Sequence, residues 1–146
     1  MNSRAMTLME VLIVVILIAT IAGFSIVSYR RAVLKARERD AVLNLSVIHG
    51  ANQIYRAKHT DYWDTSGNVI TNLDLIMQEL EINIAANDMF YSYESDIANE
   101  PDIFWVYATW HAGQADEFGL RADENIISET NPCCYVGDCP SRPACL

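Results

Sequence analysis

Few residues in this chain of 146 residues are suited to chemistry, and the most unusual of them is Glu10. It follows Met6, Thr7 and Leu8 and stands at the start of an apolar stretch, since residues 11–27 contain no ionisable side chain. A carboxylate in apolar surroundings costs several kcal/mol unless a cation pairs with it. The chemistry that Glu10 offers is therefore pairing with a positive group. The alternative is a solvated carboxylate at the edge of a membrane-spanning helix.

All four cysteines lie near the carboxyl terminus, at Cys133, Cys134, Cys139 and Cys145. An even number of clustered cysteines indicates disulfides formed in an oxidising compartment. A bridge between adjacent cysteines is strained, so we expect Cys133 and Cys134 each to pair with Cys139 or Cys145. Zinc held by all four thiolates is the alternative, although the adjacent pair suits a tetrahedral site poorly. Three prolines favour an irregular loop over residues 132–146.

Other residues that could bind or catalyse show no recognisable spacing. The histidines (His49, His59 and His111) have no ligand spacing with one another or with cysteine, and no nucleophile elbow, phosphate loop or zinc-protease pattern occurs. Four carboxylates form an acidic stretch that matches no calcium loop: Asp116, Glu117, Asp123 and Glu124. The sequence therefore predicts a protein that is not an enzyme and that has no cofactor and no metal.

The apolar stretch is long enough to cross a bilayer as a helix, because about 20 residues span about 30 Å. After Tyr29 the pattern becomes amphipathic, with apolar residues at three- and four-residue steps: Val33, Ala36, Ala41, Leu45, Ile48, Ala51 and Tyr55, with Val47 and Ile54 beside them. Charged residues mark the solvent side: Arg31, Lys35, Glu38 and Arg39. We expect one continuous helix whose outer half packs on a head domain. An independent coiled coil is the alternative, for which the run is short.

The head is predicted to be a small antiparallel sheet laid across the stem helix, an α+β arrangement. A turn-rich loop at 61–67 and a short helix at 72–80 come first, and strands are expected at 89–93, 103–110 and 117–122, with another beginning at 126–127. The strands are rich in aromatic residues: Tyr91, Tyr93, Trp105, Tyr107 and Trp110. We expect these rings to pack in the sheet, and a stacking surface for sugars or bases is the alternative.

The net charge of −9 is unevenly distributed, because residues 1–60 carry +5 and residues 61–146 carry −14. The basic stem favours anionic lipid headgroups. The acidic head argues against direct nucleic-acid binding and otherwise serves solubility. Arginines after the apolar stretch favour a cytoplasmic carboxyl-terminal side, whereas the clustered cysteines favour the outside. Charge alone therefore leaves the orientation open.

Residues 5–11, Ala-Met-Thr-Leu-Met-Glu-Val, resemble the processing site of type IV pilins and type II secretion pseudopilins. The likeness extends to about Tyr29 and more weakly to about Trp63. Two residues depart from the family pattern: Ala5 replaces the usual glycine, and Val27 stands where many pilins have proline.

The resemblance implies that prepilin peptidase cuts between Ala5 and Met6 and that the new amino group of Met6 is methylated. It also implies that this amine pairs with Glu10 of a neighbouring subunit, which would set the axial stagger of a filament. The head would then lie outside the cytoplasm, which resolves the conflict over orientation.

The expected organisation is a cleaved leader at 1–5, a transmembrane and filament-core helix at 6–28, a stem helix at 29–59, an antiparallel-sheet head at 60–131 and a cysteine-rich tail at 132–146. We expect a single-pass inner-membrane protein that becomes a subunit of an extracellular or periplasmic filament. Its partners would be copies of itself, a prepilin peptidase, the inner-membrane assembly platform and, before assembly, the membrane. The alternatives are a type II secretion pseudopilin and a membrane-anchored exported domain with an enzymatic or receptor role.

Overall fold

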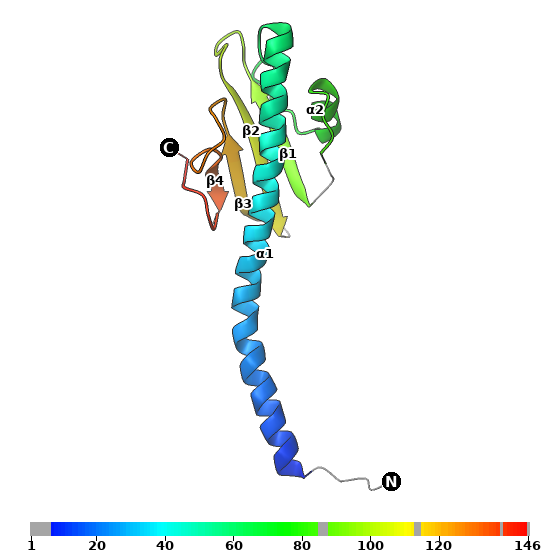
Figure 1. Ribbon diagram of the computed structural model, residues 1–146, viewed down its shortest axis with the longest axis vertical. Coiled ribbons are helices and arrows are strands. Elements are labelled where there is room, and N and C mark those ends of the chain that lie inside the picture. Colours follow the sequence, from blue (N-terminus) through cyan, green and yellow to red (C-terminus); the bar gives the residue numbers. More distant parts are fainter. Residues whose placement is uncertain (1–6, 85–87, 113–114, 138, 146) are drawn as a thin grey trace. The chain divides into compact units, whose positions relative to one another are not determined.

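A computed structural model describes residues 7–84, 88–112, 115–137 and 139–145, with the backbone alone described at 22–28, 111–112 and 115–117. The elements follow one another as α1 (Leu8–His59), α2 (Leu73–Glu79), β1 (Met89–Ser95), β2 (Phe104–Ala112), β3 (Ala115–Ala122) and β4 (Cys133–Gly137) (Figure 1). The chain divides into two compact units, Met1–Leu34 and Lys35–Leu146. The predicted α+β class with an antiparallel sheet is confirmed.

Helix α1 runs without interruption through both predicted helical segments, so the expectation of one continuous helix is confirmed. Over the ranges that the structure describes, no helix combines the length and the apolarity needed to cross a membrane.

The part of α1 in the second unit packs on the sheet through a narrow apolar face. Ala41, Leu45 and Ile48 on this face are fully buried, as their spacing predicts. Val47 and Ile54, which we expected beside this face, are instead largely exposed. Each residue turns the helix by about 100°, which carries both side chains to the side away from the sheet.

The sheet contains four antiparallel strands in the order β1-β2-β3-β4. The expected strand at 126–127 is wrong, because residues 123–131 form a loop held by the side chain of Asn131. The amide nitrogen of Asn131 donates to Asp123 Oδ1 at 2.8 Å and to the carbonyl of Asn125 at 2.7 Å. The expectation of an irregular loop at 132–146 is also wrong in part, because Cys133–Gly137 is the strand β4, paired with β3.

A buried polar network joins α1 to the sheet and to the loop after the helix. The amide nitrogen of Asn52 donates to the Tyr93 hydroxyl at 2.8 Å, and this hydroxyl donates to the carbonyl of Trp63 at 2.9 Å. The Trp63 ring stacks on Tyr93 with 4.8 Å between centroids. Because every polar atom named here has a partner, burial of these groups is compatible with a stable core.

Replacing Tyr93 with phenylalanine should lower the free energy of unfolding by about 1–3 kcal/mol. The change removes only the hydroxyl, and so leaves the buried amide nitrogen of Asn52 without its acceptor. Tyr135→Phe is a matched control on the exposed side of the sheet and should change the free energy by less than about 0.5 kcal/mol. Denaturant unfolding measures both variants, and equal effects would contradict the assignment.

Candidate functional site

The predicted processing residues, Ala5 and Met6, lie outside the described residues. The described chain begins at Thr7, whose hydroxyl accepts a hydrogen bond from the backbone N–H of Glu10 at 3.3 Å. The carbonyl of Thr7 accepts from the N–H of Val11 at 3.3 Å. Thr7 therefore caps α1, and Glu10 lies in the first turn, where a carboxylate interacts favourably with the helix dipole.

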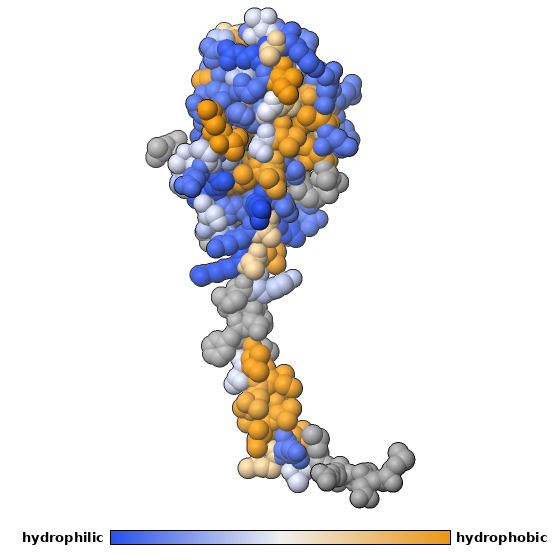
Figure 2. All heavy atoms as spheres, viewed as in Figure 1, coloured by the Kyte–Doolittle hydropathy of each residue, from blue (hydrophilic) through white to orange (hydrophobic). Residues whose placement is uncertain are grey.

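The first unit presents an unusually large apolar surface, because helix residues 8–21 are all exposed. Exposure is high at both ends of this apolar segment, with Leu8 at 83% and Ile21 at 67%. Figure 2 shows the segment as a largely hydrophobic surface on the visible face, with Glu10 as its only ionisable residue. Monomeric soluble proteins rarely expose such a continuous surface, so this surface is a candidate site of interaction.

The four cysteines form two disulfides, Cys133–Cys145 and Cys134–Cys139. The prediction that each of the adjacent cysteines pairs with one of the later two is confirmed, and the zinc alternative is wrong because no thiol remains to bind the metal. The backbone N–H of Cys134 donates to the carbonyl of Pro143 at 2.6 Å, and that of Cys145 donates to the carbonyl of Cys134 at 2.9 Å. The end of the chain is thus fastened along β4.

Glu38 is the clearest departure from the predicted solvent face of the stem, because it is only 2% exposed. Its carboxylate accepts the backbone N–H of Ser141, at 3.2 Å from Oε1 and 3.1 Å from Oε2. Burial raises the pKa of Glu38, against the opposing effects of the Ser141 hydrogen bonds and of the charges of Arg142 and Lys35. Glu38 therefore connects the stem helix to the loop that the disulfides close.

Stability should depend on pH through Glu38, since its pKa is raised in the folded state. The stabilising contribution of the protonated group is full below pH 4.5, its ordinary pKa, and is lost as the pH rises through the raised value. Glu38→Gln should therefore be increasingly more stable than the wild-type protein as the pH rises through this window. Denaturant unfolding at several pH values measures the difference, and a difference independent of pH would contradict the assignment.

Of the five strand aromatics expected to pack in the sheet, Trp105, Tyr107 and Trp110 are half-buried. Tyr91 and Tyr93 are buried, and the guanidinium of Arg37 lies over the ring of Trp110, 4.1 Å from its centroid. Tyr107 is half-buried, and burial, followed by the nearby charge of Glu94, raises its pKa to about 12. No stacking platform for sugars or bases is formed by the two buried rings.

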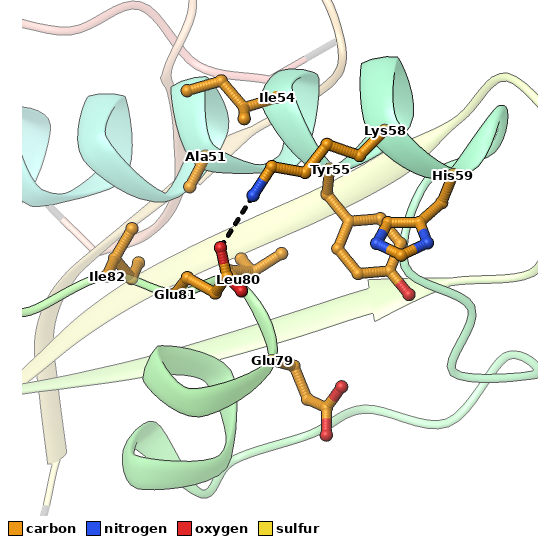
Figure 3. A pocket seen from close by; sticks show the side chains of 9 residues that line it. All are labelled: Ala51, Ile54, Tyr55, Lys58, His59, Glu79, Leu80, Glu81 and Ile82. Atoms are coloured by element: carbon orange, nitrogen blue, oxygen red, sulfur yellow. Dashed lines mark hydrogen bonds and ion pairs between the residues drawn. The ribbon is translucent and has the colours of Figure 1, made fainter.

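A pocket lies where the end of α1 meets the segment after α2. Figure 3 shows Lys58 pointing towards Glu81, and Lys58 Nζ lies 2.7 Å from Glu81 Oε2. The hydrogen bond from Lys58 lowers the pKa of Glu81. The rings of Tyr55 and His59 stack beside this pair at 4.3 Å between centroids. The arrangement is a surface ion pair beside a ring stack and contains no nucleophile with an adjacent base.

The histidines and the acidic stretch, for which the sequence predicts no site, make other contacts where their side chains are described. His49 Nε2 lies 3.1 Å from the carbonyl oxygen of Glu124, and Asp123 accepts from Asn131. The side chains of His111, Asp116 and Glu117 lie outside the described residues. Among the side chains that are described, no group of three His, Cys, Asp or Glu residues could hold a metal ion.

Besides the strands at 126–127 and 133–137, two features of the second unit were not predicted: the burial of Glu38 and the exposure of Val47 and Ile54. The first depends on a contact across 103 residues, for which the sequence carries no local signal. The second had a signal, because Leu43, Val47, Gly50, Ile54 and Ala57 recur at the three- and four-residue steps of a heptad.

Comparison of the chain with protein-family models, with curated proteins and with solved structures gave no match.

Proposed function

We propose that this chain is a structural subunit of a type IV pilus or a related filament. In this proposal prepilin peptidase cuts between Ala5 and Met6, and the processed chain assembles through its N-terminal helix. The observation that carries the proposal is the exposed apolar segment of α1, residues 8–21, with the single carboxylate of Glu10 in its first turn.

An exposed apolar helix needs a partner that covers it. Burying one leucine or isoleucine side chain contributes about 1.5–3 kcal/mol, so covering many of them strongly favours association. Lipid would cover the segment before assembly, and the helices of neighbouring subunits would cover it afterwards. The same surface then serves an inner-membrane subunit and a filament core.

Glu10 gives this association its register. An apolar helix by itself slides easily along another apolar helix, because every position is similarly favourable. A buried carboxylate without a partner costs several kcal/mol, so only registers that pair Glu10 with a cation are stable. The amino group created at Met6 by cleavage is the proposed cation.

The disulfides support a head that lies outside the cytoplasm. Two bridges lie within residues 133–145, and disulfides persist in oxidising compartments. The resulting path is insertion in the inner membrane, removal of the leader, and incorporation into an extracellular or periplasmic filament. A type II secretion pseudopilin would share these features, and the place of the filament distinguishes the two.

Imaging of cells with and without this chain tests the proposal. We expect surface filaments that carry an antibody label against the head and that are lost when the chain is deleted. Labelled filaments confined to the periplasm would assign the chain to the pseudopilins. A chain that stays a membrane-anchored monomer, with no filament in either compartment, would contradict the proposal.

A further inference from the structure

The face of the sheet that points away from α1 carries aromatic rings and polar groups. On the opposite face, the side chains of Asn44 and Asn52 in α1 donate to the hydroxyls of Tyr91 and Tyr93 at 2.7 and 2.8 Å (Figure 1). Successive side chains of a strand alternate between the two faces of a sheet, so the neighbours of these tyrosines in β1 lie on the far side. We call this far side the outer face, and it consists of Phe90, Ser92, Glu94, Trp105, Tyr107, Thr109, Arg121 and Tyr135.

Two adjoining pockets lie on the outer face. One has a volume of about 260 Å³ and is lined by Thr71, Phe90, Tyr91, Ser92 and Thr109. The other has a volume of about 230 Å³ and is lined by Val69, Ser92, Glu94, Tyr107, Thr109 and Tyr135. Ser92 and Thr109 line both pockets, so the two are continuous. Clefts that enclose a drug-sized ligand measure about 300–1,000 Å³, so each of these pockets suits one small unit of a longer ligand.

Two rings and a carboxylate lie close together in the second of these pockets. Tyr107 and Tyr135 belong to strands that are not neighbours, and their rings meet edge to face across β3 with 5.5 Å between centroids. The hydroxyl of Tyr107 donates to Glu94 Oε2 at 3.2 Å, which holds the carboxylate beside the ring. Tyr135 is 56% exposed, so most of its ring is open to a ligand. The pocket therefore offers both stacking surfaces and hydrogen-bonding groups.

The charge of the outer face favours a neutral ligand. Among its residues, Glu94 is the only acid and Arg121 the only base, so the face carries no net charge. Residues 61–146 as a whole carry −14, which repels the phosphates of a nucleic acid. A protein surface that covered the face would have to bury the Glu94 carboxylate, which is costly unless donors replace its contact with water. A ligand rich in hydroxyl groups supplies such donors.

We propose that the outer face binds a neutral saccharide. Sugar rings present C–H groups on their faces and hydroxyl groups at their rims. The C–H groups would stack on Tyr107 and Tyr135, and a rim hydroxyl would donate to Glu94. Ser92 and Thr109, between the two pockets, provide further hydrogen bonds. The site uses no residue of the apolar segment, so it goes beyond the filament role and does not depend on assembly.

Binding of the full-length chain to immobilised saccharides tests the proposal. The probes are neutral hexamers of glucose, galactose, mannose and N-acetylglucosamine, and a sulfated glucose hexamer. The chain is kept in a detergent without a sugar headgroup, so that the detergent does not compete. We expect saturable binding to at least one neutral probe and weaker binding to the sulfated one, because the head is acidic. Binding to no neutral probe, or to the sulfated probe alone, would overturn the inference.

Variants of the exposed ring locate the binding. Tyr135→Ala should weaken the affinity by about tenfold, because it removes a stacking surface. Tyr135→Phe keeps the ring and should leave the affinity nearly unchanged. Tyr29→Ala is the matched control, because Tyr29 is 71% exposed and lies in the first unit. Melting temperatures show that each variant is folded, and equal affinity of Tyr135→Ala and the wild-type chain would overturn the inference.

Glu94→Gln tests the polar part of the site. It keeps the size of the side chain and removes its charge, so the affinity should fall severalfold. The same affinity in the variant and the wild-type chain would contradict the placement of the sugar beside this carboxylate.

Photo-crosslinking distinguishes a saccharide site from a protein interface. A benzoylphenylalanine at position 135 is illuminated in cells, and we expect no protein product. A crosslink to a second copy of the chain or to another protein would overturn the inference. The absence of filaments would contradict the proposed function and leave the saccharide site intact, because binding is measured on the unassembled chain.

Discussion

Replacing Glu10 with leucine should prevent filament assembly while cleavage between Ala5 and Met6 continues. The substitution makes the apolar segment more apolar, so anchoring before assembly should not weaken. It leaves the Met6 amine of a neighbouring subunit in apolar surroundings without its carboxylate. Breaking a buried pair by removing one partner costs about 3–5 kcal/mol. At about 1.4 kcal/mol for each factor of ten, every subunit contact weakens by roughly a hundredfold or more.

The measurement is the amount of sedimented filament relative to the amount of processed chain in the membrane. Glu129→Leu is the matched control, because Glu129 is an exposed carboxylate in the head and should not affect assembly. Normal filament yield from Glu10→Leu would show that the carboxylate only caps the first turn of α1, to which Thr7 already contributes.

Removing the Cys133–Cys145 disulfide should lower the free energy of unfolding of the head more than removing the Cys134–Cys139 disulfide. Cys133 and Cys145 are 12 residues apart, and the entropy of a closed loop of that size corresponds to about 3 kcal/mol. Without this bridge, the backbone hydrogen bonds that join Cys134 to Pro143 and Cys145 should weaken. The hydrogen bonds from Ser141 to Glu38 should weaken with them. The double variant Cys133→Ser, Cys145→Ser should therefore unfold at clearly lower denaturant concentration under oxidising conditions.

The second disulfide provides the comparison. Cys134 and Cys139 are only 5 residues apart, for which the same model gives about 2 kcal/mol. The double variant Cys134→Ser, Cys139→Ser should consequently be the less destabilised of the two. A larger decrease in the free energy of unfolding for Cys134→Ser, Cys139→Ser would contradict this ranking. It would mean that the position of β4 depends mainly on the bridge to Cys139.

Local patterns in the sequence predict most of the fold. The uninterrupted helix α1 follows from apolar spacing that continues from one segment into the next, and α2 follows from Asn72, which caps it. Strand β2 is rich in aromatic and β-branched residues, which predict it well. Each of these features depends on residues close together in the chain, which is why the sequence alone reveals them.

Features that depend on distant partners were not predictable in the same way. Cys133–Gly137 has proline before it and looks irregular, yet β3 offers it an edge to pair with. Glu38 resembles other charged residues of the stem, and only the disulfide-closed loop explains its burial. In each case a long-range contact outweighs a local preference.

The features of the candidate site also differ in how far local sequence predicts them. The apolar segment with Glu10 is readable from composition and position, and so is the pairing pattern of the cysteines. A heptad of Leu43, Val47, Gly50, Ile54 and Ala57 is present in the sequence, but Val47 and Ile54 were expected beside the packing face. Two apolar stripes on one helix overlap in a sequence, and only the position of the sheet shows which of them stays exposed.

The mass of the mature chain shows whether the leader is removed. In the proposed assembly a new amino terminus is made at Met6 to pair with Glu10, and intact-mass and amino-terminal peptide measurements report that terminus. We expect a chain that has lost residues 1–5 and carries a methyl group on the nitrogen of Met6. A membrane-associated chain that keeps residues 1–5 would contradict it and would favour a permanently anchored exported domain.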